Sequence, residues 1–308
     1  MLELTQAQID RFADYKARYL PRKIASGPAY RASIAQQVEA IVRLAAAETC
    51  LRRKAHFESA LDPDAFRERV LVEEGAKVAI GGIRFRNLDP GFPFIEVTSN
   101  FDVLDLSLSR PVLAIAARQF AGFAPRGLLL AGPPGVTLAM PFERWTHVVA
   151  GASAQACAAV LPTGLCCSFP AKVDFYDAYH AAYAEWRASS PGLAPFVRIE
   201  PRQSMEEAAA AGLLASFHDA SGWCGVVGAR EEALYGTPAM YIIELFLVER
   251  WRGRRAGRAI DTALVSRMAE HYPVVWEHIH AGNLPSLRTA LAQGRSIMET
   301  EYFLPFRA

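Results

Sequence analysis

A dense group of basic residues is the first segment whose chemistry the sequence suggests. Five arginines fall within nine residues, after a run of large apolar residues: Arg250, Arg252, Arg254, Arg255 and Arg258. Backbone N–H groups at a helix start have no partner inside the helix, and with the helix dipole they attract anions. Glycine in such a turn lets a phosphate approach the backbone closely. The segment therefore predicts a site for a polyanion, such as a pyrophosphate beside a ribose phosphate.

Solvated arginines paired with acidic side chains are the alternative explanation of this segment. The formal net charge of the chain is only +1, so the cluster is a local feature and not part of a basic surface. No G-x-x-x-x-G-K-[ST] sequence occurs, and no G-x-G-x-x-G follows a predicted strand, which excludes a P-loop and a dinucleotide fingerprint. The order strand, turn, helix, with glycine in the turn, favours phosphate binding.

Helices and strands alternate on both sides of this turn. Helices are predicted over residues 5–20, 31–48, 109–121, 175–188, 203–211, 253–270 and 284–293. Strands are predicted over residues 69–74, 77–86, 94–98, 127–131, 196–199, 213–218, 223–230, 240–248, 274–280 and 302–306. We therefore expect an α/β protein with a mixed sheet. The aromatic residues of 175–188 are interpreted as a stripe that faces the core.

Residues 148–167 form an uncharged stretch rich in alanine and glycine, with Pro162 near its end. A membrane span needs ~20 strongly apolar residues, which this stretch does not supply. We predict a buried helix followed by a loop.

The basic turn resembles motif A of the GCN5-related N-acetyltransferase (GNAT) superfamily, an apolar strand followed by [Q/R]-x-x-G-x-[G/A]. The register that starts at Arg252 keeps the Trp-Arg-Gly lead-in and ends on Gly257, but it places Arg255 at the first glycine. The register that starts at Arg254 matches the pattern fully with a poorer lead-in. We prefer the first register.

A second resemblance follows at the expected distance. Asn283 opens the sequence N-L-P-S-L-R, and Gly294 comes eleven residues after it, which is similar to motif B of the same superfamily, N-x-x-[SA]-x-x with a later glycine. A predicted helix and a predicted strand separate the two motifs. The resemblance covers roughly residues 170–308 and implies the GNAT fold there.

The resemblance implies acetyl-CoA, or another acyl-CoA, as cosubstrate. Its pantetheine arm would lie in a split between two parallel strands, and a strand N–H would stabilise the oxyanion. The residues assigned to it are Leu245, Phe246, Leu247, Val248, Arg252, Gly253, Arg254, Arg255, Ala256, Gly257, Arg258, Asn283 and Ser286. Asn283 is also expected to cap the following helix.

The same resemblance implies direct attack by an amine, so the enzyme needs a base and an acid. Glu244 is the only charged residue in its apolar strand, and desolvation would raise its pKa toward the range of a general base. The alternative is that Glu244 pairs with a neighbouring arginine and only orients the acceptor. Ala290 stands where many relatives carry the tyrosine that protonates the thiol. Candidates for the acid are therefore Tyr302, Ser286, His278 and His280.

No metal site is expected. His278 and His280 share one face of their strand, but no third ligand is apparent. The five cysteines contain no C-x-x-C pair, and the N-terminus is charged from its start. We therefore expect a cytoplasmic protein.

The length of 308 residues favours two domains, predicted as 1–168 and 169–308. The first half follows a similar element order, so it is interpreted as a degenerate GNAT-like repeat. Residues 99–113 occupy the place of motif A there, without its glycines and without its cluster of arginines. This half would shape the acceptor pocket or a homodimer surface.

These features predict an N-acetyltransferase that moves an acetyl group from acetyl-CoA to the primary amine of a small molecule. The alternatives are an acyltransferase that uses a longer acyl-CoA or a protein amine, and a non-catalytic CoA-binding or CoA-sensing protein. Neither nucleic acid nor a membrane is expected as partner, because the basic residues are confined to one turn without an aromatic platform.

Overall fold

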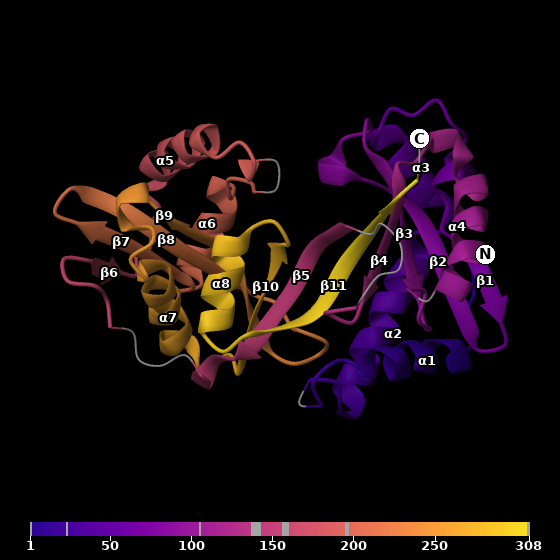
Figure 1. The fold of residues 1–308 in the computed structure, drawn as a ribbon, viewed down its shortest axis with the longest axis horizontal. Helices are drawn as coiled ribbons and strands as arrows, with labels where there is room; N and C mark the ends of the chain where they lie inside the picture. Colours follow the sequence, from indigo (N-terminus) through magenta and orange to yellow (C-terminus); the bar gives the residue numbers. More distant parts are fainter. Residues whose placement is uncertain are drawn as a thin grey trace. The chain divides into compact units, whose positions relative to one another are not determined.

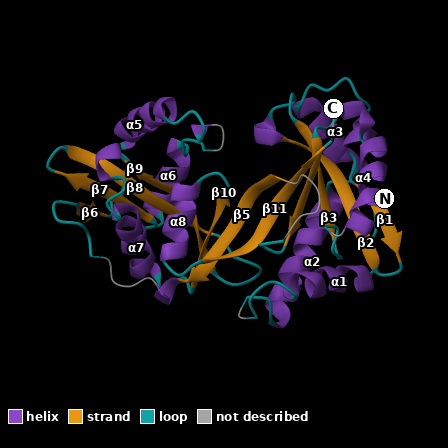
Figure 2. Cartoon of the chain, viewed as in Figure 1, coloured by secondary structure: helices purple, strands orange, loops and turns teal. Residues whose placement is uncertain are grey.

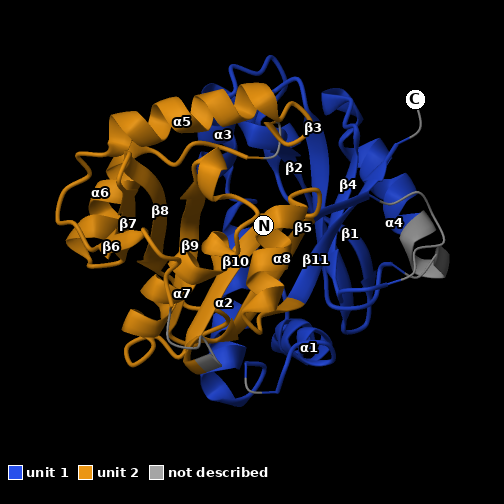
Figure 3. Ribbon diagram, turned by 60° about the vertical axis from the view of Figure 1, so that its left-hand side comes forward, with its two compact units in different colours: residues 1–145, 298–308 blue, residues 146–297 orange. Residues whose placement is uncertain are grey.

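The computed structural model describes residues 2–22, 24–104, 106–136, 143–155, 160–194 and 197–306 (Figure 1). The chain divides into two compact units (Figure 3). Unit 1 comprises residues 1–145 and 298–308, and unit 2 comprises residues 146–297. The C-terminal segment thus returns to unit 1. The domain boundary after residue 168 that we inferred from the sequence stays a prediction.

Unit 1 contains a sheet with the strand order β1-β2-β3-β4-β11. Only the pair β3–β4 is parallel, and the other neighbours are antiparallel. The elements are α1 (Gln6–Ala17), α2 (Gly27–Arg43), α3 (Ala47–His56), η1 (Pro63–Phe66), β1 (Arg69–Glu74), β2 (Lys77–Phe85), η2 (Arg86–Leu88), β3 (Pro93–Ser99), α4 (Leu106–Gln119), η3 (Ala121–Phe123), β4 (Gly127–Gly132) and most of β11 (Ser296–Pro305).

Unit 2 contains a sheet with the strand order β5-β10-β9-β8-β7-β6, in which only β9–β10 is parallel. The elements are most of β5 (Glu143–Ala152), η4 (Ser153–Gln155), β6 (Cys166–Ser168), α5 (Tyr176–Ser189), α6 (Arg202–Ala210), β7 (Leu214–Asp219), β8 (Gly222–Glu231), β9 (Ala239–Leu247), η6 (Glu249–Trp251), α7 (Ala256–Met268), β10 (Val274–His280) and α8 (Leu284–Ala292).

Helices cover both faces of the sheet in unit 2 (Figure 2). On one face, Ile260 and Leu264 of α7 pack with Ile242 of β9. On the other face, Tyr179 of α5 packs with Phe246 of β9. The strands are therefore buried from both sides, which explains their long apolar runs.

The two units repeat one arrangement of strands. The order β1-β2-β3-β4-β11 in unit 1 has the same succession of antiparallel and parallel neighbours as β7-β8-β9-β10-β5 in unit 2. In each case one helix, α4 or α7, connects the two parallel strands. This agreement supports the interpretation of unit 1 as a GNAT-like repeat. Residues 99–113, the counterpart of motif A, lie partly outside the described residues.

Residues 148–152 correct one prediction, because they belong to the strand β5 and not to a buried helix. β10 pairs with β5 over the whole length of β10, from Val274 opposite Ala152 to His280 opposite Thr146. An uncharged run such as Val148–Ala150 suits a buried strand as well as a buried helix, and periodicity cannot separate the two. The rest of the predicted stretch includes β6, and residues 156–159 lie outside the described part.

Two further expectations differ from the structure. The helix predicted over 31–48 is two helices, since α2 ends at Arg43 and α3 begins at Ala47. The strand predicted over 196–199 is wrong for residues 197–199, which have no regular structure, and residue 196 lies outside the described part. Within the described residues, no helix has both the length and the apolarity needed to cross a membrane.

Candidate active site

The parallel strands β9 and β10 pair over only part of their length. Their three paired positions end at Tyr241 opposite Trp276. β9 continues to Leu247 and β10 to His280, and the described residues show no further pair between them. From Ile242 onward, β9 therefore has no strand partner on this side. This is the split between parallel strands that the resemblance implied.

The backbone of Leu247 points toward this open edge. The Val248 N–H donates to the Cys224 carbonyl on the other side, at 3.0 Å. Because backbone groups alternate in direction along an antiparallel pair, the N–H and carbonyl of Leu247 face away from β8. Its carbonyl accepts a hydrogen bond from Arg252 Nε at 2.7 Å. The Leu247 N–H is thus a donor on the open edge, as the oxyanion role requires.

A β-bulge at Ile243 directs Glu244 to the face of the sheet covered by α5. Gly228 pairs with Glu244 and Ala229 with Ile242, so Ile243 is the extra residue. In a strand without a bulge, Glu244 would share the α7 face with Ile242, two residues before it, because side chains alternate along a strand. The bulge instead brings the carboxylate to Tyr179.

Glu244 accepts two hydrogen bonds. One comes from the Tyr179 hydroxyl to Oε2, and the other comes from the Leu245 N–H to Oε1 at 2.9 Å. Desolvation raises the pKa of Glu244 to about 7, although both hydrogen bonds act in the opposite direction. The Tyr179 hydroxyl also accepts from the Glu200 N–H at 2.9 Å, and burial beside Glu244 raises the pKa of Tyr179 far above its ordinary value.

The structure does not show Glu244 paired with an arginine, which was the alternative to its role as general base, and the role itself stays a prediction. Its hydrogen-bond partners within the described residues are Tyr179 and Leu245, and no arginine there forms an ion pair with it. Sequence reasoning missed Tyr179 as a functional residue, because it stands in the aromatic stripe of α5 and packs in the core as that stripe predicts. No sequence signal separated it from Tyr176 or Tyr183.

The turn before α7 presents a series of free backbone donors. Gly253 has φ 73° and Arg255 has φ 60°, a left-handed conformation that arginine seldom adopts. No described carbonyl or side chain accepts a hydrogen bond from the N–H groups of residues 253–258. A Cβ placed on Gly257 would make only ordinary van der Waals contact, at 3.6 Å from Thr289 Oγ1, so no atom of the protein crowds this side of the turn. The turn can therefore receive an anion.

The five arginines have different environments. Arg250 pairs with Asp219, which also accepts from Trp251 Nε1 at 2.6 Å, and these contacts hold the pKa of Asp219 well below its usual range. The remaining exposed arginines of the turn form no ion pair within the described residues: Arg254, Arg255 and Arg258. Pairing with an acid thus accounts for Arg250, and the side chains of Arg254, Arg255 and Arg258 remain for a ligand.

Arg252 braces the strand. Its guanidinium carbon lies 4.9 Å from the ring centre of Trp186 and 5.1 Å from that of Phe246. Together with the bond to the Leu247 carbonyl, these contacts fix the side chain against the α5 face. The assignment of Arg252 to the cosubstrate stays a prediction. In the structure its side chain contacts Leu247, Phe246 and Trp186.

The motif B residues lie at the start of α8. Asn283 caps this helix, as predicted, with its side-chain oxygen accepting from the Ser286 N–H at 3.4 Å. His278 Nδ1 lies 3.3 Å from the Tyr241 hydroxyl, and His280 Nδ1 accepts from the Gly282 N–H at 3.0 Å. Within the described residues, no group of histidine, cysteine or carboxylate side chains forms a metal site. The catalytic role of Ser286 stays a prediction.

Tyr302 belongs to unit 1 and not to the unit that contains Glu244. Its side chain is completely buried in the core of unit 1, and its hydroxyl donates to the Pro133 carbonyl at 2.6 Å. This hydrogen bond satisfies a buried hydroxyl, which accounts for the placement without a catalytic role. The role of Tyr302 as the acid stays a prediction.

Comparison with known proteins shows the fold. The structure is similar to a GCN5-related N-acetyltransferase from Sphaerobacter thermophilus, with a TM-score of 0.56 and 13% identity over 99% of this chain and 98% of that chain. It also matches a tandem GNAT protein from the clavulanic acid biosynthesis pathway, with a TM-score of 0.48 and 10% identity over 97% and 94% of the two chains. The sequence matches no known family model and no curated protein.

The chain therefore has the fold of the GCN5-related N-acetyltransferases over nearly its whole length. This confirms the fold class that the two motifs implied for the second half. It also extends the fold to the first half, where the motifs are missing.

Proposed function

We propose that this protein is an N-acyltransferase that moves an acetyl group from acetyl-CoA to the primary amine of a small molecule. One observation carries the proposal: the open edge of β9 bears Glu244 and leads into a turn whose N–H groups have no acceptor among the described residues. A site for a thioester, a base and a site for phosphates thus follow one another along the chain.

The residues present suit an acyl-CoA. The N–H groups of residues 253–258, with the dipole of α7, would hold the diphosphate, and the exposed side chains of Arg254 and Arg258 would add charge. The edge of β9 from Ile242 to Leu247 would pair with the amides of pantetheine. When bound, acyl-CoA supplies the activated acyl group.

The reaction needs only groups on this chain besides the two substrates. Glu244, with a pKa of about 7, takes a proton from the incoming ammonium, directly or through one water. The amine nitrogen then forms a bond with the acyl carbon, and the carbon–sulfur bond breaks. The new amide nitrogen loses its second proton, and the leaving thiolate takes up that proton to become the thiol. The Leu247 N–H would donate to the oxyanion. Tyr179 acts as a positioning residue, because it holds the carboxylate on the α5 face.

The proposal is tested by thiol release from acetyl-CoA with a panel of small amines, using the full chain. The expected result is amine-dependent release that Glu244→Gln reduces about 100-fold or more, the scale of general base catalysis. Glu207→Gln, at an exposed position on α6, is the matched control and should retain the rate. Activity that survives Glu244→Gln would refute the assigned base.

A CoA-binding protein without catalysis is the second candidate, and two residues favour it. Ala290 replaces the usual tyrosine and is buried, and Arg255 replaces the first glycine of motif A. Tight binding of CoA without turnover of any amine, by acetyl-CoA or by a longer acyl-CoA, would support this candidate against the first.

A further inference from the structure

Arg252, beside the proposed active site, is a half-buried cation that forms no ion pair with a described acid. Its Nε donates to the Leu247 carbonyl, and no described oxygen accepts from its two Nη groups. Desolvation lowers the pKa of Arg252, and the charge of Glu249 opposes this effect without an ion pair between the two. The planar fork of a guanidinium suits a carboxylate, which it binds with two parallel hydrogen bonds.

The Arg252 guanidinium lies on the same face of the sheet as the proposed base. It stands over the rings of Trp186 and Phe246, and the α5 face that these rings occupy also receives the Glu244 carboxylate. Phe246 and Glu244 are two residues apart on β9, which is about 6.6 Å along a strand. An amine at Glu244 and a carboxylate at Arg252 therefore fit within one small molecule.

The Tyr183 hydroxyl is a second, independent indication of a ligand at this place. Only 4% of Tyr183 is exposed, and its ring stacks on Phe246 with the ring centres 5.1 Å apart. No described residue forms a hydrogen bond with its hydroxyl. The oxygen is not among the fully enclosed polar atoms, so a ligand can reach it. Because nearly all buried polar groups are hydrogen-bonded, this hydroxyl favours a ligand with a polar group.

Charged side chains of both signs act on the Tyr183 hydroxyl. Desolvation raises the pKa of this hydroxyl, and the charges of Glu244 and Glu200 raise it further. The charges of Arg187 and Arg252 lower the same pKa. All four charged residues are half-buried, and none forms an ion pair within the described residues. Two acids and two cations near one hydroxyl suit a ligand that carries both charges.

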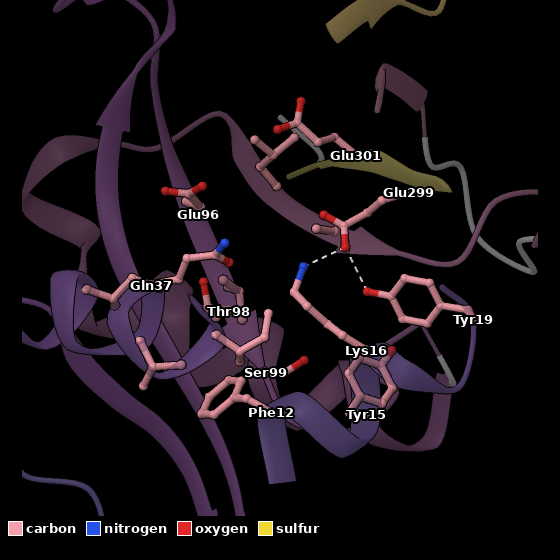
Figure 4. Close-up of a pocket in the computed structure, with 16 residues that line it drawn as sticks. Phe12, Tyr15, Lys16, Tyr19, Gln37, Glu96, Thr98, Ser99, Glu299 and Glu301 are labelled. Atoms are coloured by element: carbon pink, nitrogen blue, oxygen red, sulfur yellow. Dashed lines mark hydrogen bonds and ion pairs between the residues drawn. The ribbon is translucent and has the colours of Figure 1, made fainter. Parts of the chain in front are cut away.

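The acids of a cavity in unit 1 show the contrary case (Figure 4). This cavity lies between the helices α1 and α2 and the strands β3, β4 and β11. Its Glu299 accepts from Lys16 Nζ at 2.6 Å and from the Tyr19 hydroxyl at 2.7 Å. Its Glu96 pairs with Arg84 at 2.8 Å. The chain itself supplies partners for these two acids, unlike the charged groups on the α5 face of unit 2.

We propose that the amine acceptor carries a carboxylate, as the free amino acids do, and that Arg252 binds this carboxylate while Glu244 receives the amine. The Tyr183 hydroxyl donates to the same carboxylate. This inference rests on the acyltransferase function proposed above and names the class of its acceptor. The bonds that form and break stay those of that reaction, so Arg252 determines specificity and takes no part in the proton transfers.

The test compares amines of matched length by thiol release from acetyl-CoA with the full chain. The pairs are glycine with ethylamine, β-alanine with propylamine, and γ-aminobutyrate with butylamine. In at least one pair, kcat/KM should be at least tenfold higher for the amine that carries the carboxylate. Equal values in every pair, or a preference for 1,4-diaminobutane, would overturn this proposal and leave the acyltransferase function in place.

Variants of Arg252 assign the preference to its guanidinium. Arg252→Gln should lower the ratio of kcat/KM within the preferred pair at least tenfold, and Arg252→Lys should restore part of it. Lost bracing of β9 alone would lower the rates of both amines together, so an unchanged ratio contradicts the proposal. Arg267→Gln is the matched control, because this guanidinium also stacks on a ring, that of Phe169 at 4.2 Å, and it should keep the native ratio.

Binding separates the acceptor class from the chemistry if no amine is turned over, a result that refutes the proposed function. Calorimetry in the presence of CoA should then show at least tenfold tighter binding of one amino carboxylate than of its matched alkylamine. Arg252→Gln should remove this difference. Equal binding within all three pairs would refute the acceptor class as well.

Discussion

The Tyr179 hydroxyl donates a hydrogen bond to Glu244 Oε2, and this contact links α5 to the acid on the open edge of β9. The bond stabilises the charged carboxylate and lowers its pKa, while desolvation raises that pKa to about 7. Removing the hydroxyl removes one of the contacts that lower the pKa of Glu244, so this pKa should rise.

Tyr179→Phe should shift the pH dependence of catalysis. A base must be deprotonated, so kcat/KM of the native protein should rise with pH through a midpoint near 7. The variant should move this midpoint to higher pH and lower the rate at pH 7. Tyr176→Phe, on the same helix, is the control and should keep the native midpoint. A midpoint that moves to lower pH would contradict the assigned hydrogen bond.

Glu244→Gln should separate catalysis from binding. The amide cannot accept a proton, so kcat should fall about 100-fold or more, on the scale of a lost general base. The dissociation constant of CoA should change less than threefold, because the predicted phosphate contacts lie at residues 253–258. Steady-state kinetics and calorimetry on the same preparation measure both. A variant that loses CoA binding would point to a structural role.

Two substitutions of Gly257 distinguish the effect of side-chain volume on CoA binding from the effect of negative charge. Gly257→Ala should bind CoA nearly as well as the native protein, since the nearest atoms to a Cβ there belong to Thr289 and Leu245 and lie at 3.6 Å or more. Gly257→Glu should abolish measurable CoA binding, because it places a negative side chain where the diphosphate is proposed. Calorimetry with CoA and circular dichroism give binding and fold. Equal affinities for the two variants would be the contrary finding.

The exposed arginines should make CoA binding depend on salt. Replacing Arg254 and Arg258 by glutamine should weaken CoA at least tenfold at low ionic strength and flatten the dependence on salt. Arg267→Gln, near the end of α7, is the matched control and should behave like the native protein. The measurement is the dissociation constant at three salt concentrations. A double variant with native salt dependence would show that the arginines are only solvated.

Arg295 should be required for the stability of unit 2. It is buried and binds both Asp261, at 2.8 Å, and Glu277, which are buried as well. Arg295→Leu leaves two buried carboxylates without their cation, and such a loss typically costs about 3–5 kcal/mol. Denaturant unfolding should show this decrease, while Arg288→Ala at an exposed position of α8 should cost less than about 0.5 kcal/mol.

The sequence predicted the second half well because its signals are local. A helix start rich in glycine and arginine, the cap at Asn283, and strands such as 274–280 depend on neighbouring residues, and the structure contains these elements. The strand β5 was mistaken for a helix, because its partner β10 lies more than a hundred residues away along the chain. Pairing over that separation leaves no periodic signal in a fully buried run.

Long-range contacts also explain what was missed at the site. The bulge at Ile243 appears only in the register with β8, so the sequence could not give the face on which Glu244 lies. Tyr179 is separated from Glu244 by 65 residues, so no local pattern links the two. Tyr302 lies in the core of unit 1, although it follows motif B closely in the sequence. The return of residues 298–308 to unit 1 has no local signal either.

A crystal structure of the full chain with CoA tests the central claim most directly. The account predicts pantetheine along β9 beyond Tyr241, with the diphosphate oxygens accepting from the N–H groups of residues 253–258. CoA bound elsewhere, with those N–H groups filled by side chains of the protein, would contradict the account.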